Sequence, residues 1–362
     1  MNILQICYPA YITLQTDFLN DIMRVMQIII ESPSKALVIA TPEEIDNLRQ
    51  QLSYVNTANQ HALKRHAHNH WFKNSNPDLW TAQYNEIKAS VHNCVVFKEW
   101  DNYYIRPGSI SYLTNFPNLQ VSNKVVYPTP KAVAWEKPLP FKLHEYQEET
   151  WKRLLVAKHG NGELCTGAGK SAILLKICRE TGFRAAVIAP SKSIFNELLE
   201  KFEHHFGRKM VGRFGDGKKV LGKRFTICIG DSIANIKAGT EEWEFFSKLD
   251  MVCVDESHTW GADSLEQICH GVLADIPYRF FFSGTQTRGD GSAKLLQSII
   301  GPTVYTLSTA QAVAGGFICP HDYVIVEVES SNPNYAMPNN QGTSFGFNDS
   351  IRQQTNGRFR SQ

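Results

Sequence analysis

Between residues 141 and 320, short uninterrupted apolar runs alternate with stretches of helical spacing, and this pattern constrains the fold more than any other feature. The runs are A-A-V-I-A-P, R-F-T-I-C-I-G, L-D-M-V-C-V-D-E and Y-R-F-F-F-S-G-T, and the first is followed by S-I-F-N-E-L-L-E-K-F. Strands that are apolar at every position are buried on both faces, as in a parallel sheet covered by helices. Such sheets bind ligands at the carboxyl ends of their strands. The sequence therefore predicts an α/β fold with a doubly covered parallel sheet.

Residues 163–171, E-L-C-T-G-A-G-K-S, match the phosphate-loop pattern G-x-x-x-x-G-K-[ST] except at its first position, where Leu164 stands. That first position only has to close the loop back toward the strand. The glycines let successive N–H groups point inward at the start of the helix S-A-I-L-L-K-I-C-R, which makes an anion nest. We expect Lys170 to reach the β- and γ-phosphates and Ser171 to ligate magnesium. The predicted nucleotide-binding loop comprises Thr166, Gly167, Ala168, Gly169, Lys170 and Ser171.

A second motif follows in M-V-C-V-D-E-S-H, where an apolar strand ends in two adjacent carboxylates. Placing two acids there is costly unless a cation accompanies them, although solvated acids after a strand are the alternative. We expect Asp255 to hold magnesium through water, and Glu256 to orient and deprotonate an attacking water. The order of the two motifs along the chain supports one magnesium–triphosphate site with Lys170, Asp255 and Glu256 as catalytic residues.

The segment F-K-L-H-E-Y-Q lies some twenty residues before the phosphate loop. Gln147 at its end offers an amide donor and acceptor that could read the adenine edge and so select ATP. A glutamine on the surface of a helix is the alternative. Its position before the loop favours adenine recognition.

The chain before this region has a different organisation. N-I-L-Q-I-C-Y suggests a strand, residues 16–30 a helix, S-K-A-L-V-I-A a strand, and residues 41–52 a helix with Thr41 as N-cap and Pro42 at its first position. A β-hairpin is expected around Trp100-Asp101-Asn102. Four prolines between residues 127 and 140 indicate an extended linker. We expect a small α+β accessory domain for the DNA substrate over 1–126, the linker over 127–140 and the motor-type domain over 141–319. Residues 320–362, with one strand and a polar tail, are expected to be the start of a second motor domain or an interdomain linker.

Charge and cysteine content argue against a strongly basic nucleic-acid-binding protein and against a disulfide-bonded or zinc-binding one. The net charge is +2, so any polyanion contact has to come from a local patch. The eight cysteines form no C-x-x-C pair, which favours buried reduced thiols over disulfides or a zinc site. The N-terminal region shows neither a signal-peptide pattern nor an apolar run long enough to cross a bilayer. We therefore expect a cytoplasmic protein.

Together these motifs resemble those of superfamily 2 helicases of the DExH branch. L-C-T-G-A-G-K-S, D-E-S-H and S-G-T resemble motifs I, II and III, V-I-A-P-S-K-S-I-F-N-E resembles motif Ia, and F-K-L-H-E-Y-Q resembles the adenine-reading motif, with His144 replacing its usual arginine. The stretch after S-G-T resembles phage DNA helicases of the UvsW type, which remodel branched DNA; restriction-enzyme motor subunits share many motifs. The resemblance implies a RecA-like fold, ATP and Mg²⁺ as cofactors, and branched, double-stranded or single-stranded DNA as partner.

The resemblance also implies roles for residues at other strand ends. His258, Ser283, Gly284 and Thr285 would couple hydrolysis to DNA. DNA-backbone contacts would come from Pro190, Ser191, Lys192, Gly215, Lys218 and Ser232, since backbone amides, hydroxyls and lysines suit phosphates. Plain surface loops are the alternative for each of these residues.

One family motif is missing from the sequence: the late Q-x-x-G-R-x-x-R arginines of a second RecA-like domain, although Asn356-Gly357-Arg358 resembles the lead into that domain. We therefore expect the N-terminal portion of a motor that alone binds ATP weakly and hydrolyses it slowly. A restriction or defence translocase subunit and a truncated DNA- and nucleotide-binding module remain alternatives.

Two N-terminal stretches also mix cationic and aromatic residues. K-R-H-A-H-N-H-W-F (64–72) is expected as a surface strand or loop, with a metal site or nucleic-acid contact by Lys64, Arg65, Trp71 and Phe72 as alternatives. In D-N-Y-Y-I-R-P-G-S the tyrosines are expected to pack in a hairpin, with DNA stacking as the alternative.

Overall fold

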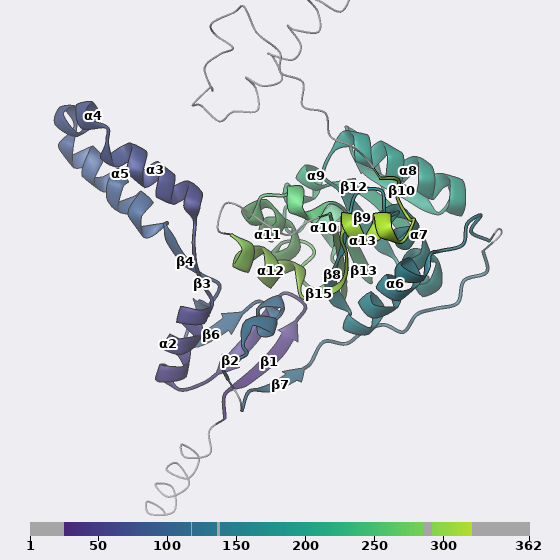
Figure 1. Cartoon of the computed structure of the whole chain (residues 1–362), viewed down its shortest axis with the longest axis horizontal. Coiled ribbons are helices and arrows are strands. Elements are labelled where there is room, and N and C mark those ends of the chain that lie inside the picture. Colours follow the sequence, from purple (N-terminus) through teal and green to yellow (C-terminus); the bar gives the residue numbers. More distant parts are fainter. Residues whose placement is uncertain (1–24, 117, 136–137, 285–291, 321–362) are drawn as a thin grey trace, which may run out of the picture. The chain divides into compact units, whose positions relative to one another are not determined.

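The computed structural model describes residues 25–116, 118–135, 138–284 and 292–320 (Figure 1). The chain divides into a compact unit of residues 1–318 and a second unit of residues 319–362. The predicted strand 2–8, the first part of the predicted helix 16–30, Thr285 and the expected strand after Pro320 lie outside the described residues. None of the described helices is long and apolar enough to cross a membrane.

An eight-stranded sheet forms the larger part of the first unit. Its order is β11-β10-β12-β9-β13-β14-β8-β15, and every strand is parallel to its neighbours except β11, which pairs antiparallel with β10. The predicted parallel sheet is confirmed, with an antiparallel edge strand added. The strands are β8 (His159–Leu164), β9 (Ala185–Ala189), β10 (Val211–Gly215), β11 (Lys218–Val220), β12 (Phe225–Ile229), β13 (Met251–Val254), β14 (Tyr278–Ser283) and β15 (Thr303–Leu307).

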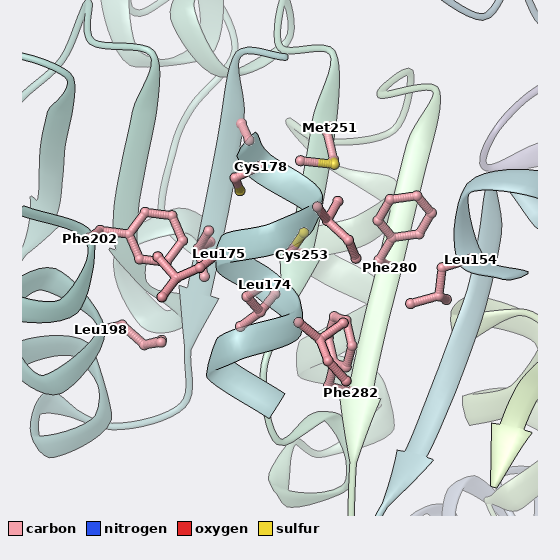
Figure 2. Packing of buried hydrophobic residues seen from close by; sticks show 14 of the residues in the cluster. Leu154, Leu174, Leu175, Cys178, Leu198, Phe202, Met251, Cys253, Phe280 and Phe282 are labelled. Carbon is pink, nitrogen blue, oxygen red and sulfur yellow. The ribbon is translucent and has the colours of Figure 1, made fainter. Parts of the chain in front are cut away.

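Helices cover both faces of this sheet, which explains why its central strands are apolar at every position. Successive strand residues point to opposite faces, so Phe280 and Phe282 of β14 pack on one side and Phe281 on the other. Figure 2 shows the first face, where Leu174 and Cys178 of α7 belong to the same buried cluster as Phe280 and Phe282 of β14. That face is covered by α6 (Glu145–Ala157), α7 (Lys170–Thr181), α8 (Lys192–Phe206) and α13 (Thr309–Ala314), and the other by α9 (Gly230–Ala234), α10 (Glu241–Phe246), α11 (Ala262–His270) and α12 (Ala293–Ile300).

The cysteines of the large sheet and its helices are buried, as expected for reduced thiols. Cys165, Cys178, Cys228, Cys253 and Cys269 are all free and buried. Burial raises the pKa of the Cys228 and Cys253 thiols well above the usual range, so these groups stay protonated and unreactive.

A five-stranded sheet of order β5-β6-β2-β1-β7 lies earlier in the chain, with its own core. The predicted strand at 34–40, the helix capped by Thr41 and the hairpin at Trp100 are confirmed. The predicted helix at 16–30 is wrong over its described residues, because residues 25 and 26 are neither helix nor strand and Gln27–Ile30 belong to β1. Three consecutive β-branched isoleucines favour that strand, which pairs with β2 and β7. The elements are β1 (Gln27–Ser32), β2 (Lys35–Ile39), α2 (Pro42–Gln51), β5 (Phe97–Glu99), β6 (Asn102–Ile105), the 3-10 helix η1 (Pro107–Tyr112) and β7 (Gln120–Asn123).

A helical arm, defined here as residues 57–89, follows α2. It consists of α3 (Thr57–Ala67), α4 (His70–Ser75) and α5 (Pro77–Ala89), which pack on one another and are flanked by the two-stranded ribbon β3 (Ser53–Val55) and β4 (His92–Cys94) (Figure 1). The strand or loop expected for residues 64–72 is therefore wrong. Asn56 and Asn69 start α3 and α4 by accepting backbone N–H bonds at 3.1 Å, and Pro77 starts α5.

The proline-rich segment 127–140 contains no helix or strand in its described part, as expected, yet it is bound along the larger sheet domain. The Lys131 amide donates to the Thr181 carbonyl at 2.9 Å, and the Trp135 indole donates to the Arg179 carbonyl at 3.1 Å. Both carbonyls belong to the last turn of α7. We refer to this segment as the strap.

Candidate active site

The phosphate-loop sequence forms a tight connection between β8 and α7. Gly167 and Gly169 adopt φ angles of 85° and 72°, a region that side chains with a Cβ rarely occupy. A Cβ on Gly169 would also lie 2.5 Å from the Nε2 atom of Gln147. Glycine is therefore required at this position by both conformation and space. The loop ends where α7 begins, so the free N–H groups of that helix face the same pocket.

Leu164 is well accommodated at the position where the pattern usually has glycine. It is the last residue of β8, pairs with Leu307 of β15, and is fully buried. Its φ angle is not positive, so the backbone there does not need glycine. The Leu164 carbonyl lies 3.4 Å from Nζ of Lys170 and so helps to hold that ammonium group over the loop.

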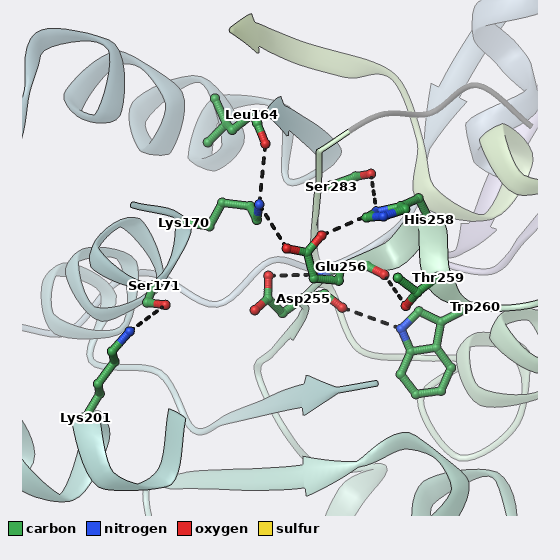
Figure 3. A network of polar contacts seen from close by, with 10 residues as sticks. All are labelled: Leu164, Lys170, Ser171, Lys201, Asp255, Glu256, His258, Thr259, Trp260 and Ser283. Carbon is green, nitrogen blue, oxygen red and sulfur yellow. Dashed lines mark hydrogen bonds and ion pairs between the residues drawn. The ribbon is translucent and has the colours of Figure 1, made fainter. Parts of the chain in front are cut away.

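The two predicted acids follow β13 and meet the loop at the carboxyl edge of the sheet (Figure 3). Lys170 Nζ lies 3.0 Å from Oε1 of Glu256, and both groups are mostly buried. Glu256 takes a left-handed φ of 47°, which turns its side chain away from the strand direction. The loop, the acids and α8 enclose a pocket of about 340 Å³.

Asp255 lies deeper than its neighbour, with 6% of its surface exposed. Burial, and next the adjacent Glu256 carboxylate, raise the pKa of Asp255 from 3.8 to about 6, while Lys170 opposes the rise. The Glu256 amide donates to Oδ1 of Asp255 at 3.0 Å. A buried carboxylate whose charge is so poorly compensated is suited to a divalent cation.

The pocket supplies the oxygen donors that a magnesium–phosphate group needs. Ser171 and Asp255 both line it, and hydroxyl and carboxylate oxygens are ligands that Mg²⁺ prefers. The Ser171 hydroxyl also accepts a hydrogen bond from Lys201 of α8 at 3.3 Å. Lys201 was missed in the sequence because a lysine on an amphipathic helix carries no local signal. The residues of the pocket thus fit a magnesium-bound triphosphate.

A polar chain links Glu256 to the neighbouring strand. His258 Nδ1 lies 3.3 Å from Oε2 of Glu256 and 2.9 Å from the Ser283 hydroxyl at the end of β14. Gly284 follows Ser283 and lies near the Thr166 side chain of the phosphate loop. Three of the four predicted coupling residues therefore gather beside the acid pair, and Thr285 lies outside the described residues.

Comparisons with known proteins agree with this geometry. The family described as "Type III restriction enzyme, res subunit" (ResIII) matches residues 140–288. The DNA 3'-5' translocase XPB2 of Sulfurisphaera tokodaii is 26% identical over 217 residues. These matches support a helicase-family domain of superfamily 2 over residues 140–288. The match to XPB2 covers 59% of this chain and 46% of that translocase, so the chain spans about half of that relative's length.

Solved helicase structures share the fold of this chain. The UvsW helicase from bacteriophage T4 superposes with a TM-score of 0.57 at 14% identity, covering 78% of this chain and 99% of that one. A second T4 UvsW structure gives a TM-score of 0.55 at 14% identity, covering 78% and 57%. The RecA-like architecture predicted from the sequence is therefore confirmed.

Gln147 supports the phosphate loop through hydrogen bonds. It is 5% exposed, its Nε2 donates to the Ala168 carbonyl at 3.0 Å, and its Oε1 accepts from the His144 amide at 2.9 Å. The Tyr146 hydroxyl donates to the same Ala168 carbonyl at 2.8 Å. Adenine recognition by Gln147 stays a prediction, whereas its contact with the loop is direct.

The predicted DNA-contacting residues divide into two groups at neighbouring strand ends. Pro190 and Ser191 line a second pocket of about 440 Å³, which also includes Asp231, next to Ser232 on α9. Gly215 and Lys218 lie in the β10–β11 hairpin, and Lys192 reaches this hairpin through a 2.7 Å ion pair with Asp216. The Ser191 hydroxyl is engaged as the N-cap of α8, accepting from Ile194 at 3.4 Å.

Trp260 connects Asp255 to the second pocket and was missed in the sequence. Its indole N–H points to the Asp255 carbonyl at 3.5 Å, and its ring lies so close to Gly230 that a Cβ there would approach within 1.6 Å. Gly230 begins α9, directly before Asp231 and Ser232. A rigid contact therefore joins the acid loop to a predicted DNA-contacting element.

Proposed function

We propose that this protein is an ATP-driven motor that moves on or remodels branched DNA. The observation that carries the proposal is the 3.0 Å contact between Lys170 and Glu256, because it brings the phosphate loop and the acid pair to one pocket. Two loops that meet in this way can bind a triphosphate and act on its terminal phosphate. The family assignment supports ATP as the nucleotide and DNA as the polymer.

The residues divide the chemistry between them. Lys170 would leave Glu256 to neutralise phosphate oxygens, while Ser171 and Asp255 would hold magnesium. A bound magnesium ion would screen the negative charge of the triphosphate. Glu256, once released by Lys170, orients the attacking water and accepts its proton. His258 holds the second carboxylate oxygen and links it to Ser283, which positions the base relative to β14.

Turnover by these residues alone is proposed to be slow. Lys170 and Lys201 are the cations among the described residues that line the pocket, and no arginine is among them. An arginine finger contributes a factor of about 10³–10⁵ to phosphoryl transfer in related motors. We therefore propose that efficient hydrolysis needs an arginine from outside the described residues.

Two other functions remain as second candidates, each with a supporting observation. The ResIII match favours a translocase subunit of a restriction or defence system. The lack of an arginine among the described residues that line the pocket favours a DNA- and nucleotide-binding module with little turnover. Strand displacement on forked DNA distinguishes the motor from the translocase, which moves along intact duplex.

The direct test is ATP binding and DNA-stimulated hydrolysis by the purified chain. Lys170→Ala is expected to abolish binding of a fluorescent ATP analogue, and Glu256→Gln to keep binding while removing hydrolysis. Lys176→Ala is the matched control, because Lys176 lies on the same helix but pairs with Glu180 at 3.0 Å. Equal ATP binding by the wild type and Lys170→Ala would exclude the proposed site.

A further inference from the structure

The tip of the helical arm, defined here as residues 61–73, carries positive charge without any acidic residue. Its sequence H-A-L-K-R-H-A-H-N-H-W-F-K contains two lysines, one arginine and four histidines. Lys64, Arg65 and Lys73 are exposed, and no carboxylate of the described residues lies within ion-pair distance of them. By contrast, most lysines and arginines of the larger sheet's surface helices pair with glutamates.

An aromatic stack holds the tip in a defined shape. The His66 ring stacks on Trp80 with centroids 5.2 Å apart, Trp80 stacks on Tyr84 at 5.1 Å, and Lys73 Nζ lies 4.8 Å from the Trp80 ring centre. His66 Nε2 and the Trp80 carbonyl are 2.9 Å apart, while the Trp80 indole donates to the His66 carbonyl at 3.0 Å. The cations are therefore presented on a structured surface.

Trp71 stands outside this stack, with 76% of its surface exposed at the first turn of α4. None of the described side chains of α4 and α5 is buried, so the arm contributes to neither hydrophobic core of the larger sheet. The exposed face of the Trp71 indole therefore lies open to a ligand, with cations on both sides of it in the sequence. Such a combination suits a polyanion that carries flat, stackable groups.

We propose that the arm tip is a second DNA contact, in which the cations bind backbone phosphates and Trp71 stacks on an unpaired base at a duplex–single-strand junction. The charge of the tip selects a polyanion, and the exposed indole selects one with accessible bases. The inference rests on the proposed motor function only for the choice of DNA as the polymer. It assigns the arm a preference for junctions, which the predicted DNA-contacting strand ends do not supply.

The test measures binding of the full chain to a labelled forked DNA and to a blunt duplex of the same sequence, without nucleotide. Loss of a stacked base contact costs about 1–3 kcal/mol, so Trp71→Ala should weaken fork binding by about 5- to 140-fold and duplex binding by less than about twofold. Trp100→Ala is the matched control, because Trp100 is 95% exposed in the β5–β6 turn and should change neither affinity.

The proposed phosphate contacts of the arm tip are tested separately, by the salt dependence of DNA binding. Lys73→Gln at the tip should reduce the slope of log affinity against log salt by about 0.7–0.9, the value for one phosphate contact. Lys88→Gln, in the last turn of α5, should leave the slope unchanged. All four substituted side chains are exposed, so circular dichroism should show the wild-type fold.

Fork binding by Trp71→Ala equal to wild type, or an equal loss in Trp100→Ala, would overturn the inference. The same Trp71→Ala substitution is also measured in Lys170→Ala, to distinguish failure of the arm contact from failure of the proposed nucleotide site. If Trp71→Ala lowers fork affinity equally in the wild type and in Lys170→Ala, the arm contact is supported even if the wild type binds no ATP. A Trp71 effect that depends on Lys170 contradicts an independent DNA contact.

Discussion

Asp255→Asn should stabilise the metal-free protein above pH 6 while abolishing hydrolysis. The pKa of Asp255 is raised from 3.8 to about 6 in the fold, so the folded state binds the proton more tightly than the unfolded state. Stability from this group is therefore fully present below pH 3.8 and is lost as the pH rises to 6. Asparagine keeps the side-chain shape and can still accept from the Glu256 amide, but it carries no charge.

The magnitude follows from the shift of about 2.2 pH units, at about 1.36 kcal/mol per unit. Asp255→Asn should raise the free energy of unfolding by about 3 kcal/mol at pH 7.5 and by about half of that at pH 5. The assay is urea unfolding followed by tryptophan fluorescence, in EDTA to exclude divalent metals. Asp231→Asn, at an exposed position in the first turn of α9, is the control and should change stability by no more than about 0.5 kcal/mol.

An Asp255→Asn protein that is equally or less stable than wild type at pH 7.5 would refute the reasoning, because the buried charge would then be compensated. Magnesium and an ATP analogue provide a second check. They should stabilise the wild type and not Asp255→Asn, since ligand binding adds stability only where affinity is retained.

Three further perturbations test other contacts. Gly230→Ala should cost about 1–3 kcal/mol of stability by pushing the Trp260 ring, and lower DNA-stimulated ATPase more than basal ATPase. Gly169→Ala should weaken binding of an ATP analogue, whereas Gly239→Ala, with a similar φ of 83° and open space, should not. Burial, and next Arg279, lower the pKa of His159 to about 3, so the unfolded state binds the proton more tightly and acid destabilises the fold. The wild type should therefore lose about 2 kcal/mol more stability than His159→Gln between pH 7.5 and pH 5, as measured by urea unfolding.

The sequence predicted the central sheet and its pocket because both leave strong local signals. Strands buried on two faces must be apolar throughout, as in β9 and β13. A phosphate loop needs glycines at fixed positions before its lysine, and the acid pair interrupts an apolar strand abruptly. These signals also predicted that Lys170 and Glu256 lie close together, since the carboxyl ends of parallel strands lie at one edge of the sheet.

Other features depend on contacts that no local pattern encodes. β8 reads H-G-N-G-E-L and becomes a central strand through its pairing with β14 and β15 rather than through apolar residues. The contact of Trp260 with Gly230 joins residues thirty positions apart, and Lys201 reaches Ser171 only because α8 packs beside α7. The arm was misjudged because alternating histidines resemble a strand, whereas Asn69 and Pro77 start new helical segments.

The strap gives the phosphate-loop helix a fixed far end. Because Lys131 and Trp135 hold the carbonyls of the final turn of α7, a rod of twelve residues runs from the phosphate loop at one tip to the strap at the other. A helix of that length is stiff, so a tilt imposed at the loop must strain or loosen the strap bonds. The exchange rate of the Lys131 amide with solvent deuterium thus offers a remote gauge of what occupies the loop.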